Sequence, residues 1–99
     1  MDLKLKNKTV FVSGSSKGIG FETAKLFLEE GATVIINGRT EESVKNALKK
    51  LNTPKVSGIT ADFIEDKQID ELIKKLPDID ILVNNVGIFR GKSFYDETE

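Results

Sequence analysis

Short apolar runs alternate along this chain with longer segments in which apolar residues recur every three or four positions. The runs lie at residues 9–12, 33–36, 56–61 and 81–83. Continuous apolar stretches of this length predict buried strands. The first intervening segment places Gly20, Ala24, Phe27 and Leu28 on one helical face, and the next two show the same spacing. The predicted order is therefore strand, helix, strand, helix, strand, helix, strand.

Turn-forming and capping residues mark the ends of the predicted helices. Gly31 ends the first helix in the manner of a C-cap. Thr40 is a candidate N-cap for the second, because its hydroxyl can accept from free amides of the first turn, and Pro54 follows that helix. The third helix, over residues 69–76, is closed by Pro77. Each helix is thus bounded within its own stretch of sequence.

This pattern predicts an α/β fold with a parallel sheet. Strands that are apolar throughout, rather than alternating, are typical of a sheet covered on both faces, and intervening helices provide the crossovers that parallel strands need. Right-handed crossovers restrict the topology, and a doubly wound sheet with strand order 3-2-1-4 fits best. The fourth strand would then be an apolar edge, which favours pairing with another chain.

Composition excludes several classes of function. Lys and Arg number 15 against 16 Asp and Glu, so the formal net charge is −1. This balance argues against a nucleic-acid-binding module and against a polybasic membrane anchor. The chain has no cysteine and no histidine, which excludes disulfides, thiolate zinc sites and His-based triads, and we expect no metal site. Without a signal peptide or a membrane-spanning run, the expected location is the cytoplasm.

Three glycines follow the first predicted strand, in the spacing Gly14-x-x-x-Gly18-x-Gly20. A glycine at 14 permits a sharp turn, one at 18 lets the backbone approach a pyrophosphate, and one at 20 allows close packing of helix and strand. The free amides at the helix start would hold the phosphates. The motif is not a P-loop, because no Gly-Lys-Ser/Thr closes it. The alternative is that these glycines only make a tight strand–helix connection.

Basic rather than acidic residues lie near the end of the second strand. In dinucleotide sites an acid at this place commonly binds the ribose 2′-hydroxyl, but here no acid occurs before Glu41. Arg39 could instead pair with a 2′-phosphate through its planar guanidinium, and Lys17 could add a second positive charge. The alternative is that both are ordinary solvated charges.

Two further motifs complete a recognisable set. Asp62 follows the third predicted strand, and Asn84-Asn85-Val86-Gly87 follows the fourth. Together with the glycine turn and the Asn-Gly-Arg-Thr sequence at residues 37–40, they resemble the N-terminal part of a classical short-chain dehydrogenase/reductase. The resemblance covers the whole chain and implies a Rossmann-like fold, with residues 1–99 as the N-terminal part of one dinucleotide-binding domain. It departs mildly at Val86, where the family usually has Ala.

The resemblance assigns expected roles to individual positions. Ser16, Lys17 and Ile19 would contact the pyrophosphate and the nicotinamide side, and Arg39 and Thr40 would meet the 2′-phosphate of NADP. The resemblance therefore implies NADP as the cofactor, with NAD less favoured. The full set of expected cofactor-binding residues is Gly14, Ser16, Lys17, Gly18, Ile19, Gly20, Arg39, Thr40, Asp62, Phe63, Asn84, Val86 and Gly87.

The positions after the third and fourth strands complete these assignments. Asp62 would accept from the adenine amino group, with the Phe63 amide alongside, and Asn84, Val86 and Gly87 would line the ribose and nicotinamide pocket. For Asn84 and its neighbour Asn85 a structural role is also expected, because buried amides there could tie the fourth strand to its neighbours through hydrogen bonds.

The family's catalytic residues are not found in this chain. The resemblance implies a Ser and a Tyr-x-x-x-Lys pair downstream of the Asn-Asn motif, in which the Tyr donates a proton as hydride reaches a carbonyl. The one tyrosine, Tyr95, is followed four residues later by Glu99 and not by Lys. We therefore expect no catalytic residue here and an inactive chain that stops before the active site. A designed fragment, a premature stop in the gene and proteolysis would each explain such a chain.

The expected function is the cofactor-binding half of an NADP(H)-dependent oxidoreductase. The resemblance implies that the complete protein reduces a carbonyl or oxidises an alcohol on a small substrate, and that it forms a homo-oligomer. The alternative is a non-catalytic, truncated Rossmann module that self-associates or regulates. The absent catalytic segment and the apolar sheet edge favour this alternative.

Overall fold

The computed structural model describes residues 5–62, 71, 72, 74, 76 and 79–85. Its elements follow the predicted alternation. They are β1 (Thr9–Val12), α1 (Gly18–Glu29), β2 (Thr33–Gly38), α2 (Glu41–Leu51), β3 (Val56–Thr60) and β4 (Ile81–Val83). For the predicted third helix, residues 71, 72 and 74 are helical. Its predicted residues Ile69 and Ile73, and Pro77 after it, lie outside the described part of the chain.

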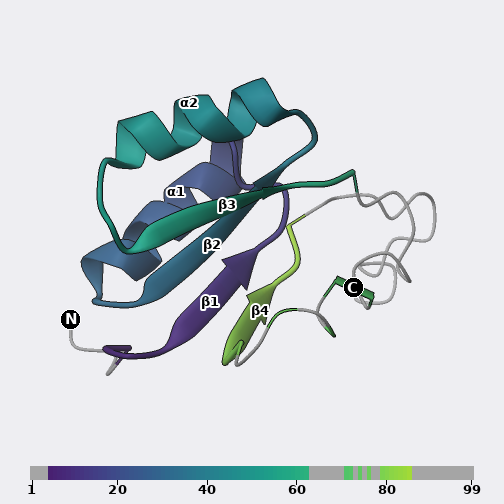
Figure 1. Ribbon diagram of the computed structural model, residues 1–99. Helices are drawn as coiled ribbons and strands as arrows, with labels where there is room; N and C mark the ends of the chain where they lie inside the picture. Colours follow the sequence, from purple (N-terminus) through teal and green to yellow (C-terminus); the bar gives the residue numbers. More distant parts are fainter. Residues whose placement is uncertain (1–4, 63–70, 73, 75, 77–78, 86–99) are drawn as a thin grey trace.

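The strands form a four-stranded sheet in the order β3-β2-β1-β4 (Figure 1). Every pairing is parallel, with Val12 aligned with Ile36 of β2 and with Val83 of β4. The predicted doubly wound order, 3-2-1-4, is therefore confirmed. The chain adds β2 and then β3 on one side of β1, and β4 lies on the other side of β1.

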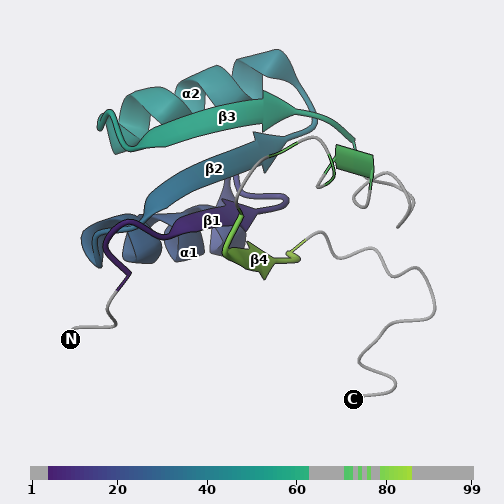
Figure 2. The same cartoon turned by 60° about the horizontal axis from the view of Figure 1, so that its bottom comes forward.

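Helices α1 and α2 lie on the same side of the sheet in both views (Figures 1 and 2). The core that they cover contains Val10, Val12, Val34 and Ile36 from the strands, packed with Ala24, Val44 and Ala47 from the helices. On the opposite face Phe11 is fully buried among Ile35, Ile59, Ala61, Leu72, Leu76 and Ile79. Alternate strand residues thus supply the two layers, which is why the strands read as continuous apolar runs.

The helix ends agree with the sequence. Gly31, with a φ of +96°, follows the end of α1. Thr40 precedes α2, and its side chain accepts a hydrogen bond from the Ser43 backbone N–H at 3.1 Å. Asn52 ends α2 in the left-handed conformation. The predicted N-cap of α2 is therefore confirmed.

The predicted strand over residues 33–36 is too short, since β2 extends to Gly38. The carbonyl of Asn37 accepts from the Ser15 N–H at 2.7 Å, and the carbonyl of Gly38 accepts from the Ala61 N–H at 3.0 Å. Backbone pairing with both neighbours therefore continues beyond the apolar run, in two residues whose side chains do not signal a strand. The predicted third strand is one residue too long, because β3 ends at Thr60.

Within the described residues no helix is both long and apolar enough to cross a membrane.

Candidate cofactor-binding edge of the sheet

The carboxyl ends of all four parallel strands lie at one edge of the sheet, and the candidate residues follow these ends (Figure 2). Residues 13–17 connect β1 to α1, Arg39 and Thr40 connect β2 to α2, and Asn84 and Asn85 come directly after β4. In open α/β sheets this is the edge at which ligands bind. The parallel topology therefore brings residues separated by up to 72 positions into one neighbourhood.

Left-handed backbone occurs at two of the three glycines in the turn after β1. The φ angles of Gly14 and Gly18 are +58° and +68°, a region that residues with a Cβ adopt only at an energetic cost. Among the described residues, no atom beyond its chain neighbours and the backbone of its own helix lies within 4 Å of the position that a Cβ on Gly18 would take. Gly18 therefore leaves open space beside the start of α1.

The third glycine, Gly20, is buried where α1 packs against the turn. A Cβ there would collide with the Gly14 carbonyl oxygen and would lie 2.6 Å from Asn85 Nδ2 and 2.9 Å from Ser15 Cα. The close approach of α1 to the end of β1 therefore requires the absence of a side chain. This confirms the packing role that the sequence predicts for Gly20.

The N-terminus of α1 has no side-chain cap and no acidic residue in its first turn. Lys17 occupies the N-cap position with extended backbone, and Ile19 in the first turn is 79% exposed. Helix α2 is different, because Thr40 caps it and Glu41 lies in its first turn. Within the described part of the chain, the start of α1 therefore has neither a capping side chain from Lys17 nor an acidic residue in its first turn to offset the positive end of its dipole.

Arg39 is exposed and follows the last residue of β2. The adjoining Gly38 is buried, and a Cβ on it would lie 2.8 Å from both Ser16 Oγ and Ser43 Oγ. Gly38 therefore keeps the β1–α1 turn close to the start of α2. Thr40 is also exposed, but its hydroxyl is engaged with Ser43 as the cap of α2.

Asn84 and Asn85 join β4 to the turn after β1. The Ser13 hydroxyl lies 3.2 Å from Asn84 Oδ1, to which it can donate, and it accepts from the Asn85 backbone N–H at 2.8 Å. Asn85 Nδ2 donates to the Gly14 carbonyl at 3.2 Å. The hydrogen-bonding role predicted for both amides is confirmed. Their predicted burial is wrong, because Asn84 is exposed and Asn85 is half-buried at the end of the edge strand.

Three buried polar side chains hold this edge together and were not singled out as functional from the sequence. They are Ser13, Ser15 and Asn37, each at most 2% exposed. Ser15 Oγ donates to the Val12 carbonyl at 2.6 Å and accepts from the Asn37 N–H at 2.8 Å. The available signal was a small polar residue at the end of an apolar run, where burial demands a hydrogen-bond partner.

Some expected site residues lie outside the described part of the chain: Phe63, Val86 and Gly87. Asp62 is described and is exposed just beyond β3. Among the described residues, no group of His, Cys, Asp and Glu side chains could hold a metal ion.

Comparisons with known proteins agree with this architecture. The family model described as short chain dehydrogenase matches residues 8–99. The uncharacterized oxidoreductase YvrD of Bacillus subtilis is 46% identical over 103 residues, covering 100% of this chain and 39% of that protein. A 3alpha-hydroxysteroid dehydrogenase of Mediterraneibacter gnavus is 38% identical over 104 residues, covering 97% of this chain and 42% of that protein.

A solved structure shows the same fold. The crystal structure of 2-keto-3-deoxy-D-gluconate dehydrogenase from Streptococcus agalactiae matches with a TM-score of 0.72 at 36% identity, covering 87% of this chain and 35% of that one. This chain thus spans well under half the length of these relatives. By its sequence and its sheet topology, the chain belongs to the short-chain dehydrogenase family of oxidoreductases, which have a Rossmann-like fold and use NAD(P) cofactors.

Proposed function

We propose that this chain is the cofactor-binding half of an NADP(H)-dependent short-chain oxidoreductase, and that the complete protein reduces a carbonyl or oxidises an alcohol. The observation that carries the proposal is the exposed Arg39, placed after β2 at the same sheet edge as the uncapped start of α1. A cation and a set of free amides at one edge suit a ligand with two separate anionic groups.

The turn after β1 fits a pyrophosphate. Gly18 leaves open space beside the first turn of α1, and Gly20 keeps that turn against the end of β1. The amides of this turn would donate to the phosphate oxygens, and the helix dipole would stabilise their charge. Lys17, exposed at the N-cap, would add a positive charge. We assign the diphosphate of the cofactor to this turn.

The end of β2 fits a 2′-phosphate better than a free ribose hydroxyl. Residues 37–40 contain no carboxylate to accept from a 2′-hydroxyl. The guanidinium of Arg39 can form two parallel hydrogen bonds to a phosphate. Thr40 would act from the cap of α2, next to this phosphate. These features support NADP over NAD.

The remaining assignments place the two ends of the cofactor. Asp62 would accept from the adenine amino group, with the Phe63 amide beside it, and Asn84, Val86 and Gly87 would line the ribose and nicotinamide pocket. When bound, the nicotinamide supplies or accepts a hydride. We propose that residues 1–99 form the N-terminal part of one dinucleotide-binding domain and contribute no catalytic residue.

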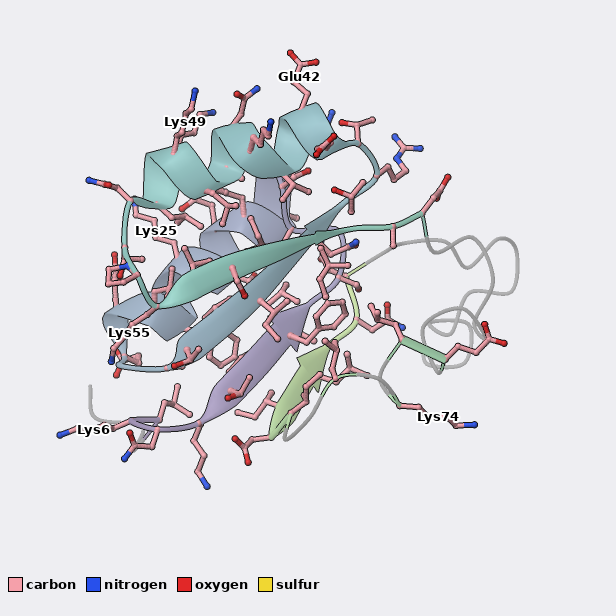
Figure 3. The ribbon with its side chains drawn as sticks, viewed as in Figure 1. Lys6, Lys25, Glu42, Lys49, Lys55 and Lys74 are labelled. Atoms are coloured by element: carbon pink, nitrogen blue, oxygen red, sulfur yellow. The ribbon has the colours of Figure 1, made fainter. Side chains whose placement is uncertain are left out.

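Nucleotide binding to the 99-residue chain tests the proposal. NADPH and NADH would be titrated by fluorescence into the unmodified chain, into Arg39→Ala and into Lys49→Ala. Lys49 is a suitable control because it is exposed near the end of α2, far from Glu42 at the start of that helix (Figure 3). All three samples would first be shown to be folded by circular dichroism.

We expect NADPH to bind more tightly than NADH. Arg39→Ala should raise the Kd for NADPH by about 10-fold or more, since a charge-assisted hydrogen bond contributes about 1.5–3 kcal/mol. Arg39→Ala should change the Kd for NADH by less than about twofold. Lys49→Ala should change the Kd for either nucleotide by less than about twofold. Preference for NADH with no effect of Arg39→Ala would refute the phosphate assignment, and binding of neither nucleotide to a folded sample would refute the whole proposal.

A further inference from the structure

Asn37 is a polar residue almost completely buried within the sheet. It lies one residue before the end of β2, and only 2% of its surface is exposed. The side chain is therefore too deep to be an obvious cofactor contact. An amide is buried at this depth only when its hydrogen-bonding groups find partners.

The side chain of Asn37 joins two segments that lie far apart in the sequence. Its Oδ1 accepts a hydrogen bond from the Gly14 N–H at 2.8 Å. Its Nδ2 donates to the carbonyls of Ile59 at 3.2 Å and Ala61 at 3.1 Å. One amide thus connects the glycine turn after β1 with the end of β3.

The backbone of Asn37 is held by the same turn. Its N–H donates to Ser15 Oγ at 2.8 Å, and its carbonyl accepts from the Ser15 N–H at 2.7 Å. Two bonds from Ser15 and one from Gly14 therefore fix the turn to β2, and the two Nδ2 bonds extend that connection to β3. Arg39 and Asp62 lie next to the segments joined in this way.

We propose that Asn37 is a positioning residue for dinucleotide binding, which fixes the glycine turn relative to the end of β3. The inference rests on the proposed function, in which that turn holds the diphosphate and the residues after β2 and β3 hold the adenosine end. A ligand that spans both places needs them at one fixed separation, and Asn37 sets this separation without touching the ligand. Preorganised spacing of this kind raises affinity because less ordering remains for the ligand to impose.

Two substitutions break the connection in different ways. Asn37→Asp is nearly isosteric and keeps an oxygen for the Gly14 N–H, but it removes both donors to β3 and sets a carboxylate oxygen against the carbonyls. Asn37→Ser is uncharged and too short to reach both segments. Should the buried charge of the first variant prevent folding, the second still tests the connection.

Two further variants serve as controls. Asn46→Asp makes the same chemical change at an exposed position of α2. Leu51→Ala removes a partly buried side chain from the core under the helices, away from the turn. It reproduces a general loss of stability without altering the connection between the turn and β3.

Calorimetric titration with two ligands distinguishes positioning from simple destabilisation. NADP⁺ spans both places, whereas 2′-AMP carries only the adenosine end and its 2′-phosphate. We expect both Asn37 variants to raise the Kd for NADP⁺ by about tenfold and to change the Kd for 2′-AMP by less than about twofold. Neither control should affect the two ligands differently. Partial unfolding raises the apparent Kd for NADP⁺ and for 2′-AMP by the same factor, because both bind only the folded chain.

The outcomes separate the inference from the proposed function. Unchanged NADP⁺ affinity in folded Asn37 variants would overturn the positioning role alone, as would equal losses for NADP⁺ and 2′-AMP that Leu51→Ala reproduces. If the unmodified chain is folded but binds neither ligand, the proposed function and the positioning role both fail.

Discussion

Replacing Gly20 by alanine tests the close packing on which the candidate site depends. The added methyl would collide with the Gly14 carbonyl oxygen and would lie 2.6 Å from Asn85 Nδ2 and 2.9 Å from Ser15 Cα. Two of these three neighbours are backbone atoms of the turn after β1, so rotating a side chain cannot relieve the overlap. Helix α1 must instead move away from the end of β1 by about half an ångström or more to restore ordinary contact distances.

The expected loss of stability follows from two opposing effects. Alanine is favoured over glycine inside a helix by about 1 kcal/mol. Overpacking against a fixed neighbour costs about 1–3 kcal/mol and sometimes more. Because the obstruction at Gly20 is mainly backbone, we take the upper part of that range and expect a net loss of about 2 kcal/mol. A urea m-value near 1–2 kcal/mol/M converts this loss to a fall of about 1 M or more in the unfolding midpoint.

Gly18→Ala provides the matched control. Gly18 begins the same helix, but in the described structure no atom outside that helix and the neighbouring residues lies within 4 Å of its Cβ position. Its φ of +68° makes alanine strained by about 1–2 kcal/mol without any overlap. The methyl of Gly18→Ala enters the space assigned to the diphosphate. For the same loss in free energy of unfolding, the Kd for NADP⁺ should therefore rise more in Gly18→Ala than in Gly20→Ala.

Urea unfolding followed by circular dichroism at 222 nm measures both variants. A crystal structure of Gly20→Ala should show α1 displaced from the turn. If Gly20→Ala unfolds at the midpoint of the unmodified chain or above it, the reasoning is refuted, because α1 would then tolerate a side chain against β1.

Three further substitutions test the fold by urea or thermal unfolding. Thr40→Ala removes the side-chain acceptor for the Ser43 N–H and should lower the free energy of unfolding by about 1 kcal/mol, whereas Thr40→Ser should retain most of it. Phe11→Ala empties a fully buried site and should cost about 3–5 kcal/mol; a loss below about 1 kcal/mol would contradict the assigned core. Ser15→Ala leaves the buried Asn37 N–H without its hydroxyl acceptor and should cost about 1–3 kcal/mol, with unchanged stability as the contrary result.

The sequence by itself determined the sheet topology, the end of α1 and the start of α2. Apolar runs that are continuous rather than alternating indicate strands covered on both faces, and the helical spacing between them leaves few right-handed arrangements. Gly31 and Thr40 act within one turn of their own helices, so neighbouring residues alone define their roles. The strand order and the cap of α2 could be predicted for this reason.

Tertiary structure decided how the pieces of the candidate edge hold one another. In the sequence Asn37 only begins the Asn-Gly-Arg-Thr motif, yet in the structure its amide joins Gly14 to Ile59, which are 45 positions apart in the chain. Hydrogen bonds of this kind depend on which strand lies beside which, and on a burial that removes water as a competing partner. The spacing of apolar residues shows which face of a helix or strand is buried. It does not show which distant segment will supply the hydrogen-bond partner of a polar side chain at the end of a strand.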